Sequence, residues 1–164
     1  MNTGATFSKD GLYRYRLWRD WDLLSYYVLF IMLNPSTADE TVNDPTIERC
    51  ERRVRALGYG GFSVCNLFAY KSTDPKALKT VDDPIGPDND LFLRRELRKA
   101  DLVICAWGKM GKMQGRQDSV LKIIEESGHK PRVLFLNKDG TPKHPLYVSY
   151  DEPVKDWDFK NEKG

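Results

Sequence analysis

One amide side chain ends the longest apolar run of this sequence at a place where it could contact a ligand. Asn34 follows the run YYVLFIML and precedes Pro35, which restricts the backbone of the residue before it. An amide both donates and accepts hydrogen bonds, so Asn34 could position a water molecule or a polar ligand, with Pro35 and Ser36 beside it. The alternative is an Asx-turn that only closes the strand.

A second amide lies inside an apolar run. Asn66 falls in FSVCNLF, where a buried amide is costly unless it is hydrogen-bonded. It could bond to neighbouring backbone, or it could recognise the edge of a planar ligand such as a nucleobase. Phe68 and Tyr70 could supply a stacking face for such a ligand, although aromatic side chains more often pack in a core.

Two further groups could take part in proton transfer. His144 lies in KHPLY, and a histidine there could donate a hydrogen bond to a developing anion. Asp39 is followed by Glu40 in a polar loop, where such acids are usually solvated. Asp39 could instead act as a general base or a metal ligand. The sequence predicts no specific metal site.

The loop GKMGKMQGR at 108–116 combines glycines and cations without an acid. It could approach phosphates through side chains and backbone amides, or it could be a solvated loop. It is not a P-loop, because the GxxxxGK[ST] string is absent. The predicted nucleic-acid-binding residues are Lys109, Lys112, Arg116 and Lys143.

The elements that would position these residues alternate between strands and helices. Strands are predicted at 12–18, 26–33, 62–68, 102–107 and 132–136, and an extended piece at LYVSY. Helices are predicted from Asp44-Pro45 to Gly58, from near Asp88, and over 117–127. Uniformly apolar strands separated by helices indicate an α/β fold with a mostly parallel sheet covered on both faces. Ligands bind at the carboxyl ends of such strands, which is where the polar residues above lie.

Composition narrows the class of protein. The 164 residues predict one α/β domain over 1–150 and a polar C-terminal tail over 151–164. The 26 basic and 24 acidic residues leave a net charge of +2, which excludes a polycation. The longest apolar run is too short to span a membrane, and no secretory signal is visible. The three cysteines lack the spacing of a metal site, so we expect them to be buried free thiols, as in a cytoplasmic protein. A monomer is the default oligomeric state.

The chain resembles the domain of unknown function 1643 family of bacteria and phages. The strings that carry the resemblance are MLNPSTAD at 32–39, DPT at 44–46, GYGG at 58–61, NLFAYKSTDP at 66–75 and KHPLY at 143–147. They cover most of the chain. The family name implies no activity.

The order of elements is more distantly similar to the uracil-DNA glycosylase superfamily. That resemblance implies a three-layer α/β sandwich, with Asn34-Pro35 as the water-positioning motif, Asn66 reading the base edge and His144 supporting the departing base. Met32 stands where the mismatch-specific branch has Gly, and Leu146 where the superfamily has Ser. The cysteines of iron–sulfur members are absent, so no cofactor is expected.

Together these features predict a nucleobase- or nucleic-acid-processing protein that hydrolyses the N-glycosidic bond of an altered or mismatched base. One alternative is a non-catalytic nucleotide- or modified-base-binding protein. Another is a metal-dependent nucleotide hydrolase or transferase that uses Asp39 and Glu40. The expected partner is DNA or a nucleotide, and the sequence leaves the base, DNA against RNA, and the oligomeric state open.

Overall fold

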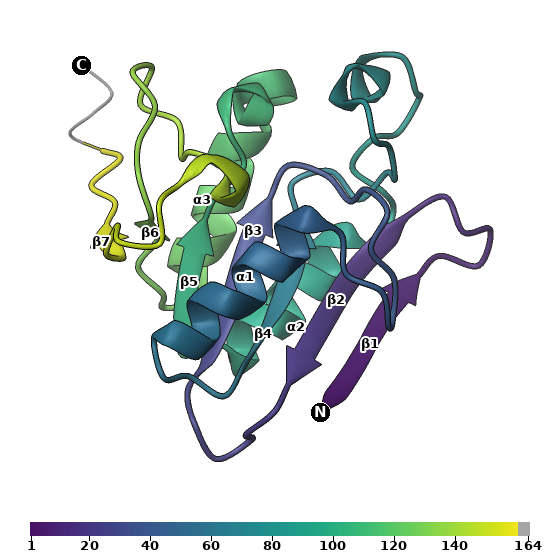
Figure 1. Ribbon diagram of the computed structural model, residues 1–164. Coiled ribbons are helices and arrows are strands. Elements are labelled where there is room, and N and C mark those ends of the chain that lie inside the picture. Colours follow the sequence, from purple (N-terminus) through teal and green to yellow (C-terminus); the bar gives the residue numbers. More distant parts are fainter. Residues whose placement is uncertain (161–164) are drawn as a thin grey trace.

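A seven-stranded sheet forms the centre of the computed structural model, which describes residues 1–160 (Figure 1). In chain order the strands are β1 (Asn2–Phe7), β2 (Arg14–Asp20), β3 (Tyr27–Met32), β4 (Gly61–Asn66), β5 (Leu102–Cys105), β6 (Arg132–Val133) and β7 (Lys155–Asp156). In space they follow the order β1-β2-β4-β3-β5-β6-β7. The helices are α1 (Pro45–Ala56), α2 (Asn89–Lys99) and α3 (Arg116–Glu126), with short 3-10 helices η1 (Pro75–Lys79), η2 (Lys109–Gly115) and η3 (Pro145–Tyr147).

The sheet is mixed, so the prediction of a mostly parallel sheet is wrong. The inner strands β4, β3, β5 and β6 pair in parallel, whereas β1, β2 and β7 pair antiparallel. The inner strands β3, β4 and β5 are buried almost throughout, which produces the continuous apolar runs. The edge strand β1 is largely half-exposed and has no such run, so the sequence pattern did not reveal it.

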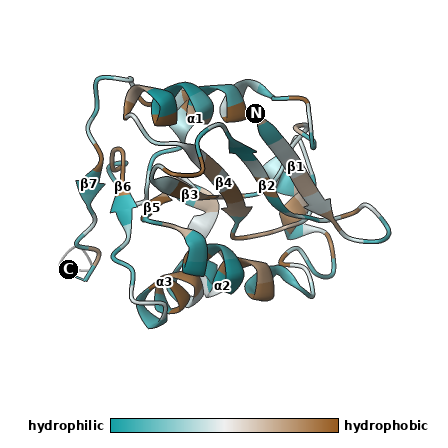
Figure 2. Cartoon of the chain, turned by 90° about the horizontal axis from the view of Figure 1, so that it is seen from below, coloured by the Kyte–Doolittle hydropathy of each residue, from teal (hydrophilic) through white to brown (hydrophobic). Residues whose placement is uncertain are grey.

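Helices cover both faces of the sheet, as predicted. Figure 2 shows α1 on one side and α2 with α3 on the other. The alternation of side chains along β3 divides the core: Leu29 and Ile31 pack toward α2 and α3, whereas Phe30 and Met32 pack toward α1. The three cysteines are free and buried, as expected.

The helix boundaries follow their capping residues. Asp44 is the N-cap of α1 and accepts a hydrogen bond from the backbone N–H of Ile47, with Pro45 at the first helical position, as predicted. Asp88 precedes α2, and α3 begins one residue before its predicted start. Helix existence and placement are therefore confirmed.

The LYVSY segment differs from its prediction, and the C-terminal tail adds a strand that was not predicted. The LYVSY segment is not extended throughout, because Pro145–Tyr147 forms η3. In the tail, β7 pairs with β6, and the side chain of Trp157 is buried against Trp107 with ring centroids 5.7 Å apart. The tail thus closes one edge of the sheet. No helix within residues 1–160 is long and apolar enough to cross a membrane.

Candidate ligand-binding pocket

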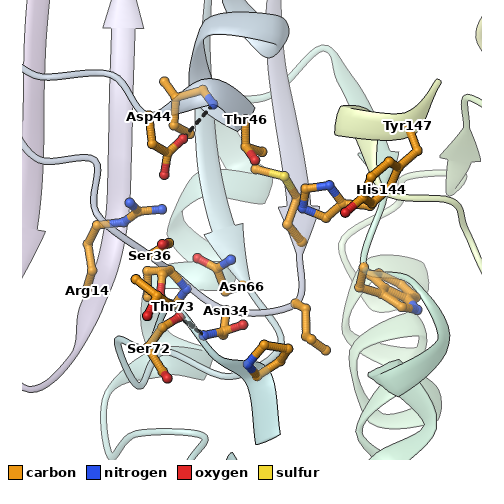
Figure 3. A pocket seen from close by; sticks show the side chains of 16 residues that line it. Arg14, Asn34, Ser36, Asp44, Thr46, Asn66, Ser72, Thr73, His144 and Tyr147 are labelled. Carbon is orange, nitrogen blue, oxygen red and sulfur yellow. Dashed lines mark hydrogen bonds between the residues drawn. The ribbon is translucent and has the colours of Figure 1, made fainter. Parts of the chain in front are cut away.

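A cavity of about 330 Å³ lies at the carboxyl ends of β3, β4 and β5. The chain reaches β4 on one side of β3 and β5 on the other, so this is a topological switch point, where α/β sheets bind ligands. The lining residues are Arg14, Met32, Leu33, Asn34, Pro35, Ser36, Asp44, Thr46, Ile47, Asn66, Ser72, Thr73, Pro75, Trp107, His144 and Tyr147. The structure thus brings Asn34, Asn66 and His144 to one pocket (Figure 3).

The amide of Asn34 is held by the backbone of the neighbouring loops. Its Nδ2 donates to the carbonyl oxygens of Ser72 at 2.9 Å and Pro35 at 3.2 Å, and lies 3.5 Å from that of Tyr70. Because the NH₂ group is used in this way, the side chain offers its oxygen to the pocket as a hydrogen-bond acceptor. Such an oxygen can orient a water molecule by accepting a hydrogen bond from it.

Asn66 ends β4 and is only 2% exposed. Its Oδ1 is buried and has no hydrogen-bond partner within residues 1–160. The carbonyl of the same residue accepts from Nδ2 of Asn89 at 2.9 Å, which anchors the strand end. A buried amide oxygen without a partner is costly, and a ligand N–H group in the pocket would supply that partner.

His144 is the N-cap of η3, and its ring is held in one tautomer. Nδ1 accepts the backbone N–H of Leu146 at 3.3 Å, so in the neutral ring the proton lies on Nε2. Burial lowers the pKa of His144, and the charge of Asp44 opposes that shift only in part. At neutral pH the residue is therefore an uncharged imidazole with one N–H donor available to the pocket.

A family model described as a protein of unknown function, DUF1643, matches residues 14–146. The chain belongs to the DUF1643 family. No curated protein and no solved structure matches it. The match spans every predicted site residue, and the family description assigns none of them a role.

Other predicted residues of this DUF1643 chain lie outside the pocket. Asp39 accepts hydrogen bonds from the backbone N–H groups of Thr41 and Val42, at 2.9 and 2.8 Å, and these bonds lower the pKa of Asp39. Phe68 is fully buried in the core, and the ring of Tyr70 lies edge-on to another tyrosine. The aromatic side chains that do line the pocket are Trp107 and Tyr147.

The predicted basic loop follows β5, but its cations do not line the pocket. Lys112 donates to the carbonyl of Asp139 at 3.2 Å. Arg116 is 4% exposed and donates to the carbonyl of Leu67 at 2.7 Å, so it ties α3 to the end of β4. Lys109 is exposed, and Lys143 lies over the ring of Phe135.

Two charged residues of the pocket were not singled out from the sequence. Asp44 was recognised as a helix cap, but among the described residues it is also the one carboxylate that lines the cavity. Arg14 was assigned to a strand without a role. Because β2 is antiparallel to β4, the first residue of β2 lies at the same sheet edge as the last residue of β4. The strand direction, which apolar patterning does not encode, was the missing signal.

The DUF1643 pocket holds one histidine and one carboxylate, fewer than the three or four protein ligands of a typical zinc site. Within residues 1–160 no group of three or more histidine, cysteine or acidic side chains is arranged to hold a metal ion. The polar side chains of the pocket offer hydrogen-bond donors and acceptors.

Proposed function

We propose that this pocket hydrolyses the N-glycosidic bond of a nucleobase-containing ligand. The observation that supports the proposal most directly is the convergence of Asn34, Asn66 and His144 on one cavity. The three residues come from loops and strand ends far apart in the sequence. Each offers a fixed hydrogen-bonding group of a kind that recognises a base or supports its departure.

The leaving base would be stabilised by His144. When the bond between the sugar C1′ and the base nitrogen breaks, the electron pair leaves with the base, which becomes an anion. The Nε2 proton of neutral His144 would be donated in a hydrogen bond to that anion, without prior ionisation of the ring. The unpartnered oxygen of Asn66 would accept an N–H of the base and so set its orientation.

The attacking water would be positioned by Asn34 and deprotonated by Asp44. The oxygen of Asn34 accepts a hydrogen bond but is too weak a base to remove a proton. Asp44 uses one carboxylate oxygen to cap α1, at 2.9 Å from the backbone nitrogen of Ile47, and the other oxygen remains to accept a proton. The water oxygen bonds to C1′, its proton passes to Asp44, and the base is released.

The exposed ring of Tyr147 would stack on the planar base. Trp107 is buried and Tyr147 is 69% exposed, and both line the cavity together with apolar groups such as Ile47. An exposed tyrosine at a pocket mouth can stack on a base without a cost to the fold. This arrangement replaces the predicted stacking role of Phe68 and Tyr70, which do not line the cavity.

The test is release of free base from DNA carrying uracil, mismatched thymine or modified pyrimidines, and from free nucleosides and nucleotides. We expect His144→Asn to reduce turnover about 10²-fold or more, because the donor to the leaving base is lost. Asp44→Asn preserves the helix cap and should reduce turnover about 10²-fold. His129→Asn is the matched control, because His129 lies outside the cavity and bonds to Leu97.

Absence of base release from every substrate would contradict the proposal. So would equal activity in His144→Asn and the His129→Asn control. An Asp39→Asn effect larger than that of Asp44→Asn would contradict the assignment of Asp44 as the base.

The second candidate is a non-catalytic nucleotide- or base-binding protein. The buried Asn66 Oδ1 without a partner favours it, because a ligand N–H group could satisfy that oxygen without any bond being cleaved. Tight binding of a nucleotide with no turnover, unchanged by Asp44→Asn, would select this alternative.

A further inference from the structure

Arg14 differs from the other deeply buried arginines of this chain. Four arginines within residues 1–160 are at most 4% exposed: Arg14, Arg19, Arg53 and Arg116. The last three each direct at least two of their nitrogens to acceptors within the fold. Their positive charges are thus surrounded by carbonyl or carboxylate oxygens, as buried guanidinium groups require.

The guanidinium of Arg14 has far fewer partners. It is 2% exposed, and its Nη1 donates to the carbonyl of Ala38 at 3.1 Å. Its Nε is buried and has no hydrogen-bond partner in the described chain. No acid within residues 1–160 forms an ion pair with it. A buried cation with so little compensation is costly to the fold.

Arg14 keeps its charge at neutral pH and faces the cavity. Burial lowers the pKa of Arg14 to about 10, and the charge of Asp44 opposes the shift. Asp44 does not neutralise the guanidinium by direct contact. Figure 3 shows the side chain of Arg14 entering the pocket from β2, on the side where Ser36 and Thr73 also line it. Hydroxyl groups beside a guanidinium are typical partners of phosphate oxygens.

We propose that Arg14 is the anion subsite of the pocket and that it binds the phosphate monoester of a free nucleotide. The nucleotide part of this inference rests on the proposed function, because it takes the other end of the ligand to be a base. The planar fork of a guanidinium fits phosphate oxygens, with Nε as one of its donors. A bound phosphate would supply the acceptor that Nε lacks.

The observations favour a free nucleotide over a nucleic-acid strand. Arg14 is almost completely enclosed, whereas the phosphates of a strand are joined on both sides to sugars that would need room to leave the pocket. The cavity, about 330 Å³, is at the small end of the range for small-molecule sites. The cations of the 109–116 loop do not line it, so no run of phosphate contacts leads away from Arg14.

The first experiment uses the wild-type protein and inorganic phosphate, with NMR detection of arginine Nε–H signals. We expect phosphate to shift the Nε–H signal of Arg14, assigned by its loss in Arg14→Lys, and to leave that of Arg53 unchanged. An unshifted Arg14 signal at saturating phosphate would overturn the anion subsite. This NMR signal reports phosphate binding without any turnover, so it tests the anion subsite independently of N-glycosidic cleavage.

The second experiment compares nucleosides with their 5′-monophosphates by calorimetry. We expect the monophosphate to bind about ten- to a hundredfold more tightly, and Arg14→Gln to remove that difference. Arg53→Gln is the control of matched burial and should preserve the difference, with circular dichroism confirming that both variants fold.

Equal affinity for nucleosides and monophosphates in the wild-type protein would overturn the subsite even if base release were observed. Competition by an oligonucleotide that lacks a terminal phosphate, as strong as that by the monophosphate, would overturn the assignment to a free nucleotide. Phosphate-dependent binding without base release would support the subsite while contradicting the proposed hydrolysis.

Discussion

The imidazole of His144 links the chemistry of the pocket to the stability of the fold. Its Nδ1 is committed to the backbone N–H of Leu146, and its burial disfavours the charged ring. Protonation of Nδ1 would break this cap and place a positive charge in a buried site. The neutral form that suits a hydrogen-bond donor to a departing base is therefore the form that the folded chain favours.

The lowered pKa of His144 makes the stability of the folded protein depend on pH. The pKa of His144 is lower in the folded chain than its usual value of 6.5. Between those two values the unfolded chain binds more protons than the folded chain, so the free energy of unfolding decreases as the pH falls below 6.5. Above that pH the group has no further effect. Chemical denaturation of wild type and His144→Asn at several pH values measures this.

We expect the wild-type protein to lose more stability than His144→Asn on acidification from about pH 7 to about pH 5. Asn can accept the same Leu146 hydrogen bond without titrating, so it is a matched replacement. If the free energy of unfolding changes equally with pH in the two proteins, the His144 ring is not buried in the folded chain.

At the scale of single elements, the turn between β2 and β3 is bonded to Gly60, the residue directly before β4. Gly60 donates to the carbonyl of Tyr26 at 2.8 Å, and its own carbonyl accepts from the backbone of Trp21 and Asp22 at 2.9 Å each. A Cβ at Gly60 would overlap the carbonyl oxygen of Asp22. This turn aligns β2 against β4, and so it sets where Arg14 lies relative to the pocket.

Gly60→Ala should therefore destabilise the protein by about 3 kcal/mol, because backbone rather than a flexible side chain must move. Gly58 supplies the control: its φ is +79°, but a Cβ there would meet open space. Gly58→Ala should cost only about 1 kcal/mol, from the left-handed backbone alone. Thermal and urea denaturation of both variants compare the two costs, and equal losses would contradict the close approach at Gly60.

The inner strands β3, β4 and β5 were predicted well from the sequence, because a strand that is buried on both faces has a continuous run of apolar residues. The carboxyl ends of parallel strands meet at one edge of the sheet, and this rule predicted that Asn34, Asn66 and His144 lie close together. The apolar pattern did not reveal β1, whose residues are largely half-exposed, or the place of Arg14, which depends on β2 running antiparallel to β4. Sequence periodicity reports burial, but it does not report strand direction.

Asp44 shows a second reason why the sequence did not reveal every residue of the pocket. Its position before Pro45 identified it as a helix cap, and that role is confirmed. One carboxylate can cap a helix with one oxygen and face a cavity with the other, so a local role does not exclude a second one. Asp39 was the more conspicuous acid, but its hydrogen bonds to Thr41 and Val42 hold it in a turn outside the cavity.

For the whole molecule, the net charge of +2 does not show which arginines are bound within the fold and which face the cavity. Arg49 and Arg53 donate to carbonyls of 145–152 and hold the C-terminal segment against α1. Arg19 and Arg116 are bound within the fold. Of these, none lines the cavity, and Arg14 is the cation that does. This distribution is the one expected from the proposal that Arg14 binds a small anionic ligand.

The most direct test of the account is hydrolysis in ¹⁸O-labelled water. The purified protein is incubated with the common nucleoside 5′-monophosphates and with uracil-containing DNA, and mass spectrometry locates the label in the products. We predict free, unlabelled base and a single ¹⁸O in the sugar hydroxyl at C1′, with the reaction slowed about 10²-fold in Asp44→Asn. Label in the base or in phosphate, or no product from any substrate, would contradict N-glycosidic hydrolysis by this pocket.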